Sequence, residues 1–175
     1  MKTCYTAYYP SPLGSFAITC NANSVVRAYF LDPEQDLFSN LPSSLALIDH
    51  GAPPILKQAL SQISQYFKGT RKDFDLPLDL SGPPFYLKVW QELMNIPFGA
   101  TVSYGAIAKS VGNERACRAV GMANNRNPVS IIVPCHRVIG SNGQLVGYGG
   151  GLDRKEWLLA WEKKVVSDEK KCLPL

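Results

Sequence analysis

The chain has 175 residues, with 18 Lys+Arg, 14 Asp+Glu and five cysteines. Hydrophobic residues make up 46% of it and charged residues 18%, a globular composition that argues against disorder. The sequence holds no run of 18 apolar residues and no apolar signal segment at its start, so we expect no membrane association and no secretion. Scattered cysteines in odd number favour a reducing compartment, which is the cytoplasm, or the nucleus in a eukaryote.

The charge is divided unevenly along the chain. Residues 1–84 carry a net charge of −1 and residues 85–175 a net charge of +5. A basic C-terminal half is compatible with a polyanionic partner, although solvated surface lysines give the same pattern.

The first half has the pattern of a mixed α/β segment. Residues 14–20 and 24–31 are apolar runs separated by turn residues, which predicts a β-hairpin. Residues 32–50 form a polar connection. Apolar residues at helical spacing predict a helix over residues 53–68, and a loose alternation over residues 73–80 suggests a further strand.

A cluster of turn residues at 81–84 is the best candidate for a domain boundary, because the charge balance changes after it. We therefore expect an α/β N-terminal domain over residues 1–84, with a small sheet and a helix. Residues 85–175 are expected to form a mainly α-helical C-terminal domain.

The second half contains two short predicted helices close together. Ser103 is a suitable N-cap for the first, and Gly112 is a suitable stop. The second is predicted over residues 115–125. Two short helices joined by such a turn resemble a helix-turn-helix, although many helical corners of this kind never bind DNA.

Other elements surround this pair. Residues 85–94 are predicted to form an amphipathic helix and residues 155–164 a final helix. Residues 129–133 have the composition of a buried strand, and residues 147–151 form a glycine-rich loop.

Cys135 is the strongest candidate for chemistry. It follows the buried run directly and precedes His136 and Arg137. A cysteine becomes a nucleophile when its thiol is deprotonated, and a nearby imidazole can serve as the base. Neighbouring residues of an extended strand point to opposite sides, so contact between Cys135 and His136 needs a turn or a bridging water. A Cys-His pair alone is weak evidence, since a buried structural cysteine is the commoner case.

The wider sequence pattern is much more specific. The motifs that follow one another in order are Ile96-Pro97-Phe98-Gly99, Ser103-Tyr104-Gly105, Arg118-Ala119-Val120-Gly121, Asn127-Pro128, Pro134-Cys135-His136-Arg137-Val138, Gly147-Tyr148-Gly149-Gly150 and Lys155-Glu156-Trp157-Leu158-Leu159. This order resembles the O6-alkylguanine-DNA alkyltransferases, also called methylated-DNA–protein-cysteine methyltransferases, over about residues 85–162. The N-terminal half resembles them less, mainly at residues 11–14.

The resemblance implies direct reversal of DNA damage. The thiolate of Cys135 would take the alkyl group from O6 of guanine, or from O4 of alkylthymine, irreversibly and once per molecule. His136 would remove the thiol proton through a water, and Glu162 would orient His136. Tyr104 would donate a proton to the leaving base, and no cofactor or metal would be needed.

The same resemblance implies a DNA interface. The damaged base would be flipped out of double-stranded DNA, and Arg118 would fill its place from the minor groove. Gly105, Asn113 and Ser141 would contact the DNA backbone. The base pocket would include Val138 and Gly149, where some relatives have serine, and Asn127 would be a structural hinge. A monomer is expected because the lesion is single.

Other functional classes fit the sequence less well. A sensor of alkylated DNA would lack the cysteine, and a transcription regulator would need a further module. A Cys-His hydrolase would leave Arg118 and the helix-turn-helix unexplained.

Overall fold

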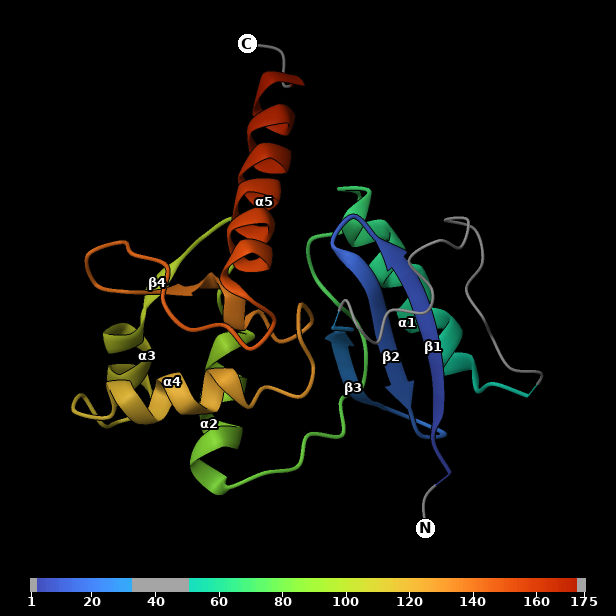
Figure 1. The fold of residues 1–175 in the computed structure, drawn as a ribbon, viewed down its shortest axis with the longest axis horizontal. Coiled ribbons are helices and arrows are strands. Elements are labelled where there is room, and N and C mark those ends of the chain that lie inside the picture. Colours follow the sequence, from blue (N-terminus) through green and yellow to red (C-terminus); the bar gives the residue numbers. More distant parts are fainter. Residues whose placement is uncertain (1–2, 33–50, 173–175) are drawn as a thin grey trace. The chain divides into compact units, whose positions relative to one another are not determined.

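The structure is a computed structural model that describes residues 3–32 and 51–172 (Figure 1). The chain divides into two compact units. The first contains residues 1–80 together with residues 128–132, and the second contains residues 81–127 and 133–175. The domain limits of 1–84 and 85–175 stay a prediction.

The first unit is built on a three-stranded antiparallel sheet. Its strands are β1 (Tyr5–Ser11), β2 (Gly14–Cys20) and β3 (Val25–Phe30), in the order β1-β2-β3. Helix α1 (Pro54–Phe67) begins with proline at its first position and packs its apolar face on this sheet (Figure 1). This arrangement agrees with the predicted hairpin and helix, and it adds the strand β1, which the sequence pattern did not reveal.

Two predicted strands are corrected by the structure. Residues 73–80 form no strand, and an isolated bridge joins Leu78 to Val25 of the sheet. Residues 129–133 are almost entirely buried, as predicted, but they are not a regular strand either. Ile131 lies at φ 70°, a conformation that β-branched residues rarely adopt and that bends the chain sharply. The segment is attached to β3 through Ala28, whose N–H donates to Pro128 O at 2.9 Å and whose carbonyl accepts from Ser130 N at 2.7 Å.

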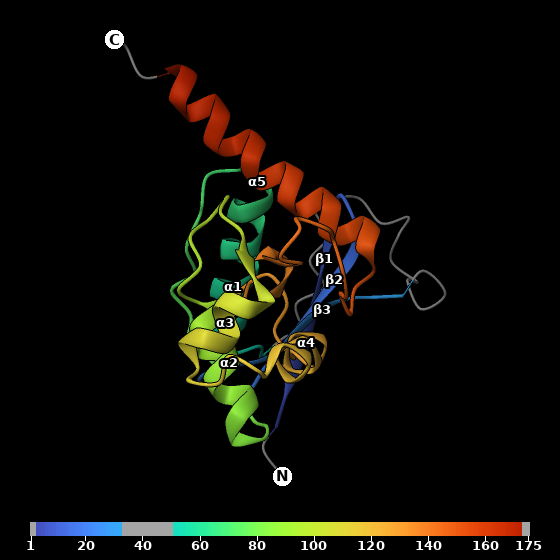
Figure 2. The same cartoon turned by 90° about the vertical axis from the view of Figure 1, so that its left-hand side faces the viewer.

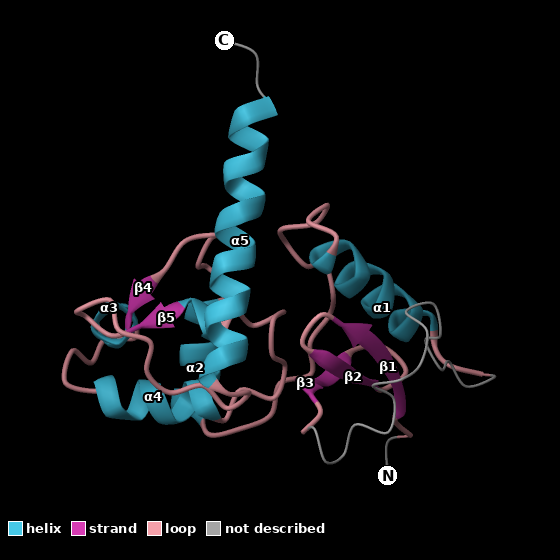
Figure 3. Ribbon diagram, turned by 45° about the horizontal axis from the view of Figure 1, so that its top comes forward, coloured by secondary structure: helices cyan, strands magenta, loops and turns pink. Residues whose placement is uncertain are grey.

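The second unit is mainly helical, as predicted. Its elements are α2 (Pro84–Leu93), β4 (Val102–Ser103), α3 (Tyr104–Ser110), α4 (Cys117–Asn125), the 3₁₀ turn η2 (Cys135–Arg137), β5 (Val138–Ile139) and α5 (Leu152–Cys172). The short strands β4 and β5 pair in parallel and lie side by side (Figure 3). Helix α5 is one continuous helix (Figure 2), longer than the ten residues that the sequence predicted.

Helices α3 and α4 form the predicted two-helix corner. The Ser103 hydroxyl accepts a hydrogen bond from Ala106 N at 3.1 Å and thereby caps α3. Gly112 at φ 81° ends α3 in the left-handed conformation that glycine adopts without strain. The indole of Trp90 on α2 donates to Ala123 O on α4 at 2.8 Å, which fixes α4 to the core of this unit.

Helix α5 carries polar groups into the core of the second unit. Lys155, Leu158, Glu162 and Val165 recur at helical spacing and are all buried. A buried lysine and glutamate on one helix face are costly unless they are paired, so their partners define a polar site. Within the described residues, no helix is long and apolar enough to cross a membrane.

Candidate active site

Cys135 is the first residue of η2 and is only 3% exposed. Its Sγ accepts a hydrogen bond from Asn127 Nδ2 at 3.1 Å, and the same amide donates to Val133 O at 2.8 Å. Asn127 therefore connects the end of α4 to the segment before the cysteine, and its role as a hinge stays a prediction. It also binds the sulfur itself, which the sequence did not predict.

The thiol lies among groups that act on its pKa in opposite directions. Burial raises the pKa of Cys135, while the Asn127 hydrogen bond and the positive charge of Lys155 oppose that rise. A thiolate at this position is therefore stabilised by the Asn127 amide, the Lys155 cation and the backbone N–H groups of Cys135 and His136, although desolvation outweighs them.

His136 follows Cys135 within the 3₁₀ turn and is completely buried. Its Nε2 lies 2.9 Å from Glu162 Oε1, while its Nδ1 makes no hydrogen bond with any described residue. Burial lowers the pKa of His136, although Glu162 opposes this, so the imidazole is neutral at pH 7. Nε2 then carries the proton that Glu162 accepts, which leaves the Nδ1 lone pair to act as a base.

Glu162 is held by a cation as well as by the imidazole. Arg137 donates from Nε to Oε2 at 3.0 Å and from Nη2 to Oε1 at 3.0 Å, a bidentate pair. Gly99 N donates to Oε2 at 2.9 Å. Burial by itself would raise the pKa of Glu162, but His136 and Arg137 lower it to about 2. Arg137 is a permanent cation, so the carboxylate stays ionised and holds the His136 ring in one orientation.

Lys155 is a functional candidate that the sequence reasoning missed, although it belongs to one of the quoted motifs. It is completely buried on α5, and its Nζ donates to the carbonyls of Val138 at 2.7 Å, Val146 at 2.9 Å and Gly147 at 3.3 Å. Burial lowers the pKa of Lys155, and the charge of Cys135 opposes this. Apart from its place in the quoted motif, no signal in the sequence singles out Lys155, because the sequence does not reveal which lysine is buried.

Tyr104 begins α3 and faces the same loop as Lys155. Its hydroxyl donates to Val146 O at 2.8 Å and lies 3.2 Å from Gly147 O, and its ring centroid is 5.7 Å from Lys155 Nζ. Burial raises the pKa of Tyr104, and the charge of Cys135 adds to this rise. Tyr104 therefore lies within electrostatic reach of the thiol.

A groove of about 500 Å³ opens beside Tyr104. Its lining residues come from α3, α4 and the loop before α5: Tyr104, Cys117, Arg118, Gly121, Met122, Asn125, Val146 and Gly147. Arg118 is exposed near the start of α4, and the apolar side chains of Met122 and Val146 are also exposed. A basic residue beside exposed apolar surface on a helix-turn-helix is the composition of a surface that binds another molecule.

The other predicted residues lie on several elements of the second unit. Gly105 is on α3, Asn113 is exposed in the turn after it, and Ser141 is exposed in the turn after β5. The Val138 carbonyl is already engaged by Lys155. A Cβ atom at Gly149 would lie 3.2 Å from both O and Oδ1 of Asn125, so a serine there would displace its neighbour.

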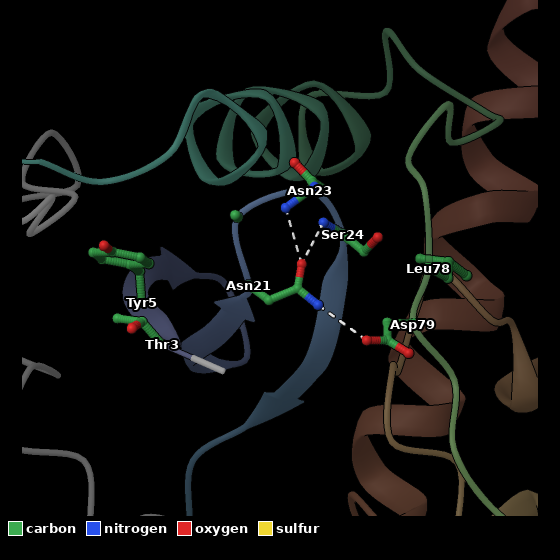
Figure 4. A pocket seen from close by; sticks show the side chains of 8 residues that line it. Thr3, Tyr5, Asn21, Asn23, Ser24, Leu78 and Asp79 are labelled. Carbon is green, nitrogen blue, oxygen red and sulfur yellow. Dashed lines mark hydrogen bonds between the residues drawn. The ribbon is translucent and has the colours of Figure 1, made fainter. Parts of the chain in front are cut away.

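A separate cavity of about 670 Å³ lies in the first unit (Figure 4). It is lined by Tyr5, Ser24 and Asp79, among others, and by none of the predicted site residues. The Asn21 side chain there accepts from two backbone N–H groups and donates to Asp79, which stabilises the turn between β2 and β3. Across residues 3–32 and 51–172, no cluster of His, Cys, Asp and Glu could hold a metal ion.

Together, these features define a class of protein that combines a helix-turn-helix with a buried cysteine beside a His–Glu pair. Comparison with known families and structures identifies the class further. The DNA-binding domain model of 6-O-methylguanine DNA methyltransferase matches residues 84–164, and the ribonuclease-like domain model of the same family matches residues 4–80.

Individual relatives agree with these family matches. The chain is 46% identical to the methylated-DNA–protein-cysteine methyltransferase of Mycobacterium leprae, over 89% of this chain and 90% of the relative. It is 42% identical to that of Methanosarcina acetivorans, over 90% and 97%. Among crystal structures, the Mycobacterium tuberculosis O6-methylguanine methyltransferase matches with a TM-score of 0.77 and 38% identity, over 93% and 94%. That organism's OGT in complex with DNA matches with a TM-score of 0.77 and 40% identity, over 90% and 92%.

The chain belongs to the O6-methylguanine DNA methyltransferase family, whose members here are methylated-DNA–protein-cysteine methyltransferases. The family, fold class and enzyme class predicted from the sequence are thereby confirmed. The roles of the individual site residues are proposals, which follow.

Proposed function

We propose that the protein repairs double-stranded DNA by transferring the alkyl group of O6-alkylguanine to Cys135, with O4-alkylthymine as a second candidate substrate. The observation that carries this proposal is the position of the thiol. Cys135 is buried and its sulfur accepts a hydrogen bond from Asn127, and the buried Lys155 that favours a thiolate there shares the Val146 carbonyl with Tyr104, which lines the groove on the helix-turn-helix.

The reaction is a displacement at the alkyl carbon. The sulfur forms a C–S bond as the bond between that carbon and O6 breaks, and the electron pair of the broken bond stays with the base. The thiol proton passes through a water to His136 Nδ1, and the base leaves with one proton on its ring. Tyr104 assists by donating its hydroxyl proton toward the ring as negative charge develops.

The ion cluster behind His136 supports this role. A neutral imidazole held by Glu162 can accept a proton at Nδ1, and the ionised carboxylate then stabilises the imidazolium. The product is a thioether, which cellular thiols do not cleave. The protein therefore acts once per molecule and needs no cofactor.

A buried thiol cannot reach a base inside a duplex, so the base must be flipped out at a cost of about a few kcal/mol. Arg118, exposed at the groove on α4, fills the space left by the base from the minor-groove side. Gly105, Asn113 and Ser141 contact the DNA backbone. Phosphate contacts make binding weaken as salt rises. The protein binds as a monomer, because the lesion is single and asymmetric.

The test follows the lesion in DNA. A duplex with one O6-methylguanine is mixed with excess protein, and the remaining lesion is measured after digestion to nucleosides. We expect the wild type and Cys117→Ser to remove the lesion, and Cys135→Ser to leave it. Cys117 is a matched control because its thiol is exposed at the same groove. Removal by Cys135→Ser would contradict the proposal, and binding of the lesion without removal by the wild type would favour a sensor.

The role of Arg118 is tested with two substrates. Arg118→Ala is expected to slow transfer from the duplex strongly and from O6-methyldeoxyguanosine little, since the nucleoside needs no flipping. Arg126→Ala removes the same charge from the other, exposed end of α4 and serves as the control. Equal losses on both substrates would contradict a flipping role.

A further inference from the structure

Asn124 is a buried polar residue to which no role is yet assigned. It lies on α4 and is only 6% exposed. Neither Oδ1 nor Nδ2 makes a hydrogen bond of standard geometry with any described residue. A buried amide is normally paired, because leaving it unpaired costs free energy. An unpaired buried amide near the end of α4, the helix that lines the groove, therefore suggests a hydrogen bond that forms only during function.

The candidate partner on which the structure bears is the hydroxyl of Tyr104. Burial raises the pKa of Tyr104, and the Asn124 amide opposes this rise as a hydrogen-bonding neighbour, although the geometry falls short of a full hydrogen bond. A hydrogen-bonding neighbour lowers the pKa of a phenol when it donates to the phenol oxygen. The donor of the Asn124 amide is Nδ2, so Nδ2 is the group that acts on Tyr104. Gly121, one turn earlier on α4, lies against the same ring: a Cβ there would be 3.9 Å from Tyr104 Cε1.

The Tyr104 hydroxyl is engaged elsewhere in this structure. It donates to Val146 O at 2.8 Å and lies 3.2 Å from Gly147 O. The same two carbonyls also accept from Lys155 Nζ, at 2.9 and 3.3 Å. Tyr104 can therefore turn its proton away from the loop without leaving either carbonyl unpaired, because Lys155 continues to satisfy both.

We propose that Asn124 is a positioning residue for Tyr104: its Nδ2–H donates to the phenol oxygen when the hydroxyl turns from the loop to the leaving base. This inference rests on the proposed function. A phenol oxygen that accepts a hydrogen bond gives up its own proton more readily, so the amide makes Tyr104 a better donor. Among the described residues, the other charged or titratable groups that act on this phenol or share its groove are Lys155, Cys135, Arg118 and Cys117.

The first test is Asn124→Leu, which keeps a similar volume and removes the amide. We expect the single-turnover rate of methyl transfer to fall about fivefold, the worth of one neutral hydrogen bond. The pKa of Tyr104, followed by NMR of protein labelled at the tyrosine ring carbon and assigned with Tyr104→Phe, is expected to rise. Asn124→Asp, which replaces the donor by a carboxylate, is expected to raise it further. Asn95→Leu removes an exposed amide that does not line the groove and should leave the Tyr104 pKa unchanged.

A double-mutant cycle gives the decisive comparison. In the Tyr104→Phe background, Asn124→Leu is expected to cause no further loss of rate, because the hydroxyl through which it acts is gone. An equal loss in both backgrounds would overturn the inference, and so would an unchanged rate and an unchanged Tyr104 pKa. Duplex affinity is measured with Cys135→Ala added, and an affinity loss as large as the rate loss would also overturn it.

The two levels of proposal fail in different ways. If the wild type transfers no methyl group, the proposed function is wrong whatever the Asn124 variants do. If the wild type transfers and the Asn124 variants do so equally fast, only the positioning role is wrong. Should Asn124→Leu fail to fold, Asn124→Asp, which has nearly the same shape, supplies both the rate and the pKa.

Discussion

The second unit holds two polar regions that are built in contrasting ways. The first is the ion cluster of His136, Arg137 and Glu162, where every carboxylate oxygen is bound at about 3 Å and all three residues are buried. The second is the groove side of Tyr104, where a hydroxyl and a lysine share loop carbonyls and the amide of Asn124 has no full hydrogen bond.

This difference suggests that the two regions have different roles in the reaction. The base that takes up the thiol proton needs one fixed orientation, which the ion cluster provides before DNA arrives. The groups that meet the damaged base must exchange partners when it enters, so their hydrogen bonds are shared or incomplete. The predictions that follow test each side of the contrast.

The largest effect is expected on the fixed side. Glu162→Gln keeps the shape of the side chain but leaves the Arg137 charge buried without a counter-charge. Breaking a buried ion pair costs about 3–5 kcal/mol, so the free energy of unfolding should fall by that order in a urea titration. Glu156→Gln on the exposed face of the same helix is the control. A loss equal to that of the control would contradict the view that the cluster holds the unit together.

A second effect should appear on the groove side, in rate and not in stability. Tyr104→Phe removes the proton donor, and general acids contribute about a hundredfold or more, so the single-turnover rate should fall by about that factor. Duplex affinity, measured with Cys135→Ala, should change little. A comparable loss of affinity would mean that Tyr104 binds the base and does not assist its departure.

Lys155 acts on both regions, because it shares the Val146 carbonyl with Tyr104 and its charge acts on His136. Its replacement should have an effect of intermediate size on the reactivity of the thiol. Its charge lowers the pKa of Cys135, so Lys155→Met should raise that pKa and shift the pH dependence of thiol alkylation upward. At pH 7 we expect alkylation by iodoacetamide to slow about tenfold, which corresponds to one pKa unit. Lys163→Met, exposed on the same helix, should leave the rate unchanged.

The ion cluster also predicts how the protein responds to acid. The pKa of Glu162 is lowered from its ordinary 4.5 to about 2, so the folded state binds this proton less readily than the unfolded chain does. The stabilisation is complete above the ordinary value and is lost as the pH falls from 4.5 toward 2. Urea titrations across this range should show a steeper decline for the wild type than for Glu162→Gln; parallel curves would contradict the lowered pKa.

The smallest effect is expected at Gly149. A side chain there meets Asn125 at 3.2 Å, so Gly149→Ser should reduce the free energy of unfolding by about 1 kcal/mol through overpacking. Thermal unfolding measures this directly. A stabilised Gly149→Ser protein would show that the loop accommodates serine and that contact with Asn125 is not the reason for glycine at this position.

The sequence predicted the helices and the Cys135 motif better than it predicted the strands and the site's polar contacts. Helical spacing identified α1 and α2 to within a residue or two, because each has a continuous apolar face. The run at 129–133 has strand composition, yet Ile131 at φ 70° bends it, and composition carries no information on φ. Strand β1 was missed because its faces are only partly buried.

At the site, too, the sequence did not predict the contacts that depend on the fold. Family resemblance assigned roles to Cys135, His136, Glu162 and Tyr104, and these roles stay predictions, although the structure does pair His136 with Glu162. It assigned nothing to Lys155 or Asn124, because a lysine and an asparagine on helices are usually solvated. Their importance arises from burial, which depends on contacts between segments far apart in sequence. Of the predicted connection at residues 32–50, residues 33–50 lie outside the described residues.

The most direct test of the central claim is the mass of the protein itself. Intact-protein mass spectrometry follows mixing with an equimolar duplex that carries one O6-methylguanine, and peptide mapping locates any change. We predict a gain of about 14 Da, one methylene equivalent, on Cys135 and no further gain with excess duplex, as expected of an acceptor that reacts once. An unchanged mass after the lesion has been bound, or a gain on another residue such as Cys117, would contradict alkyl transfer to Cys135.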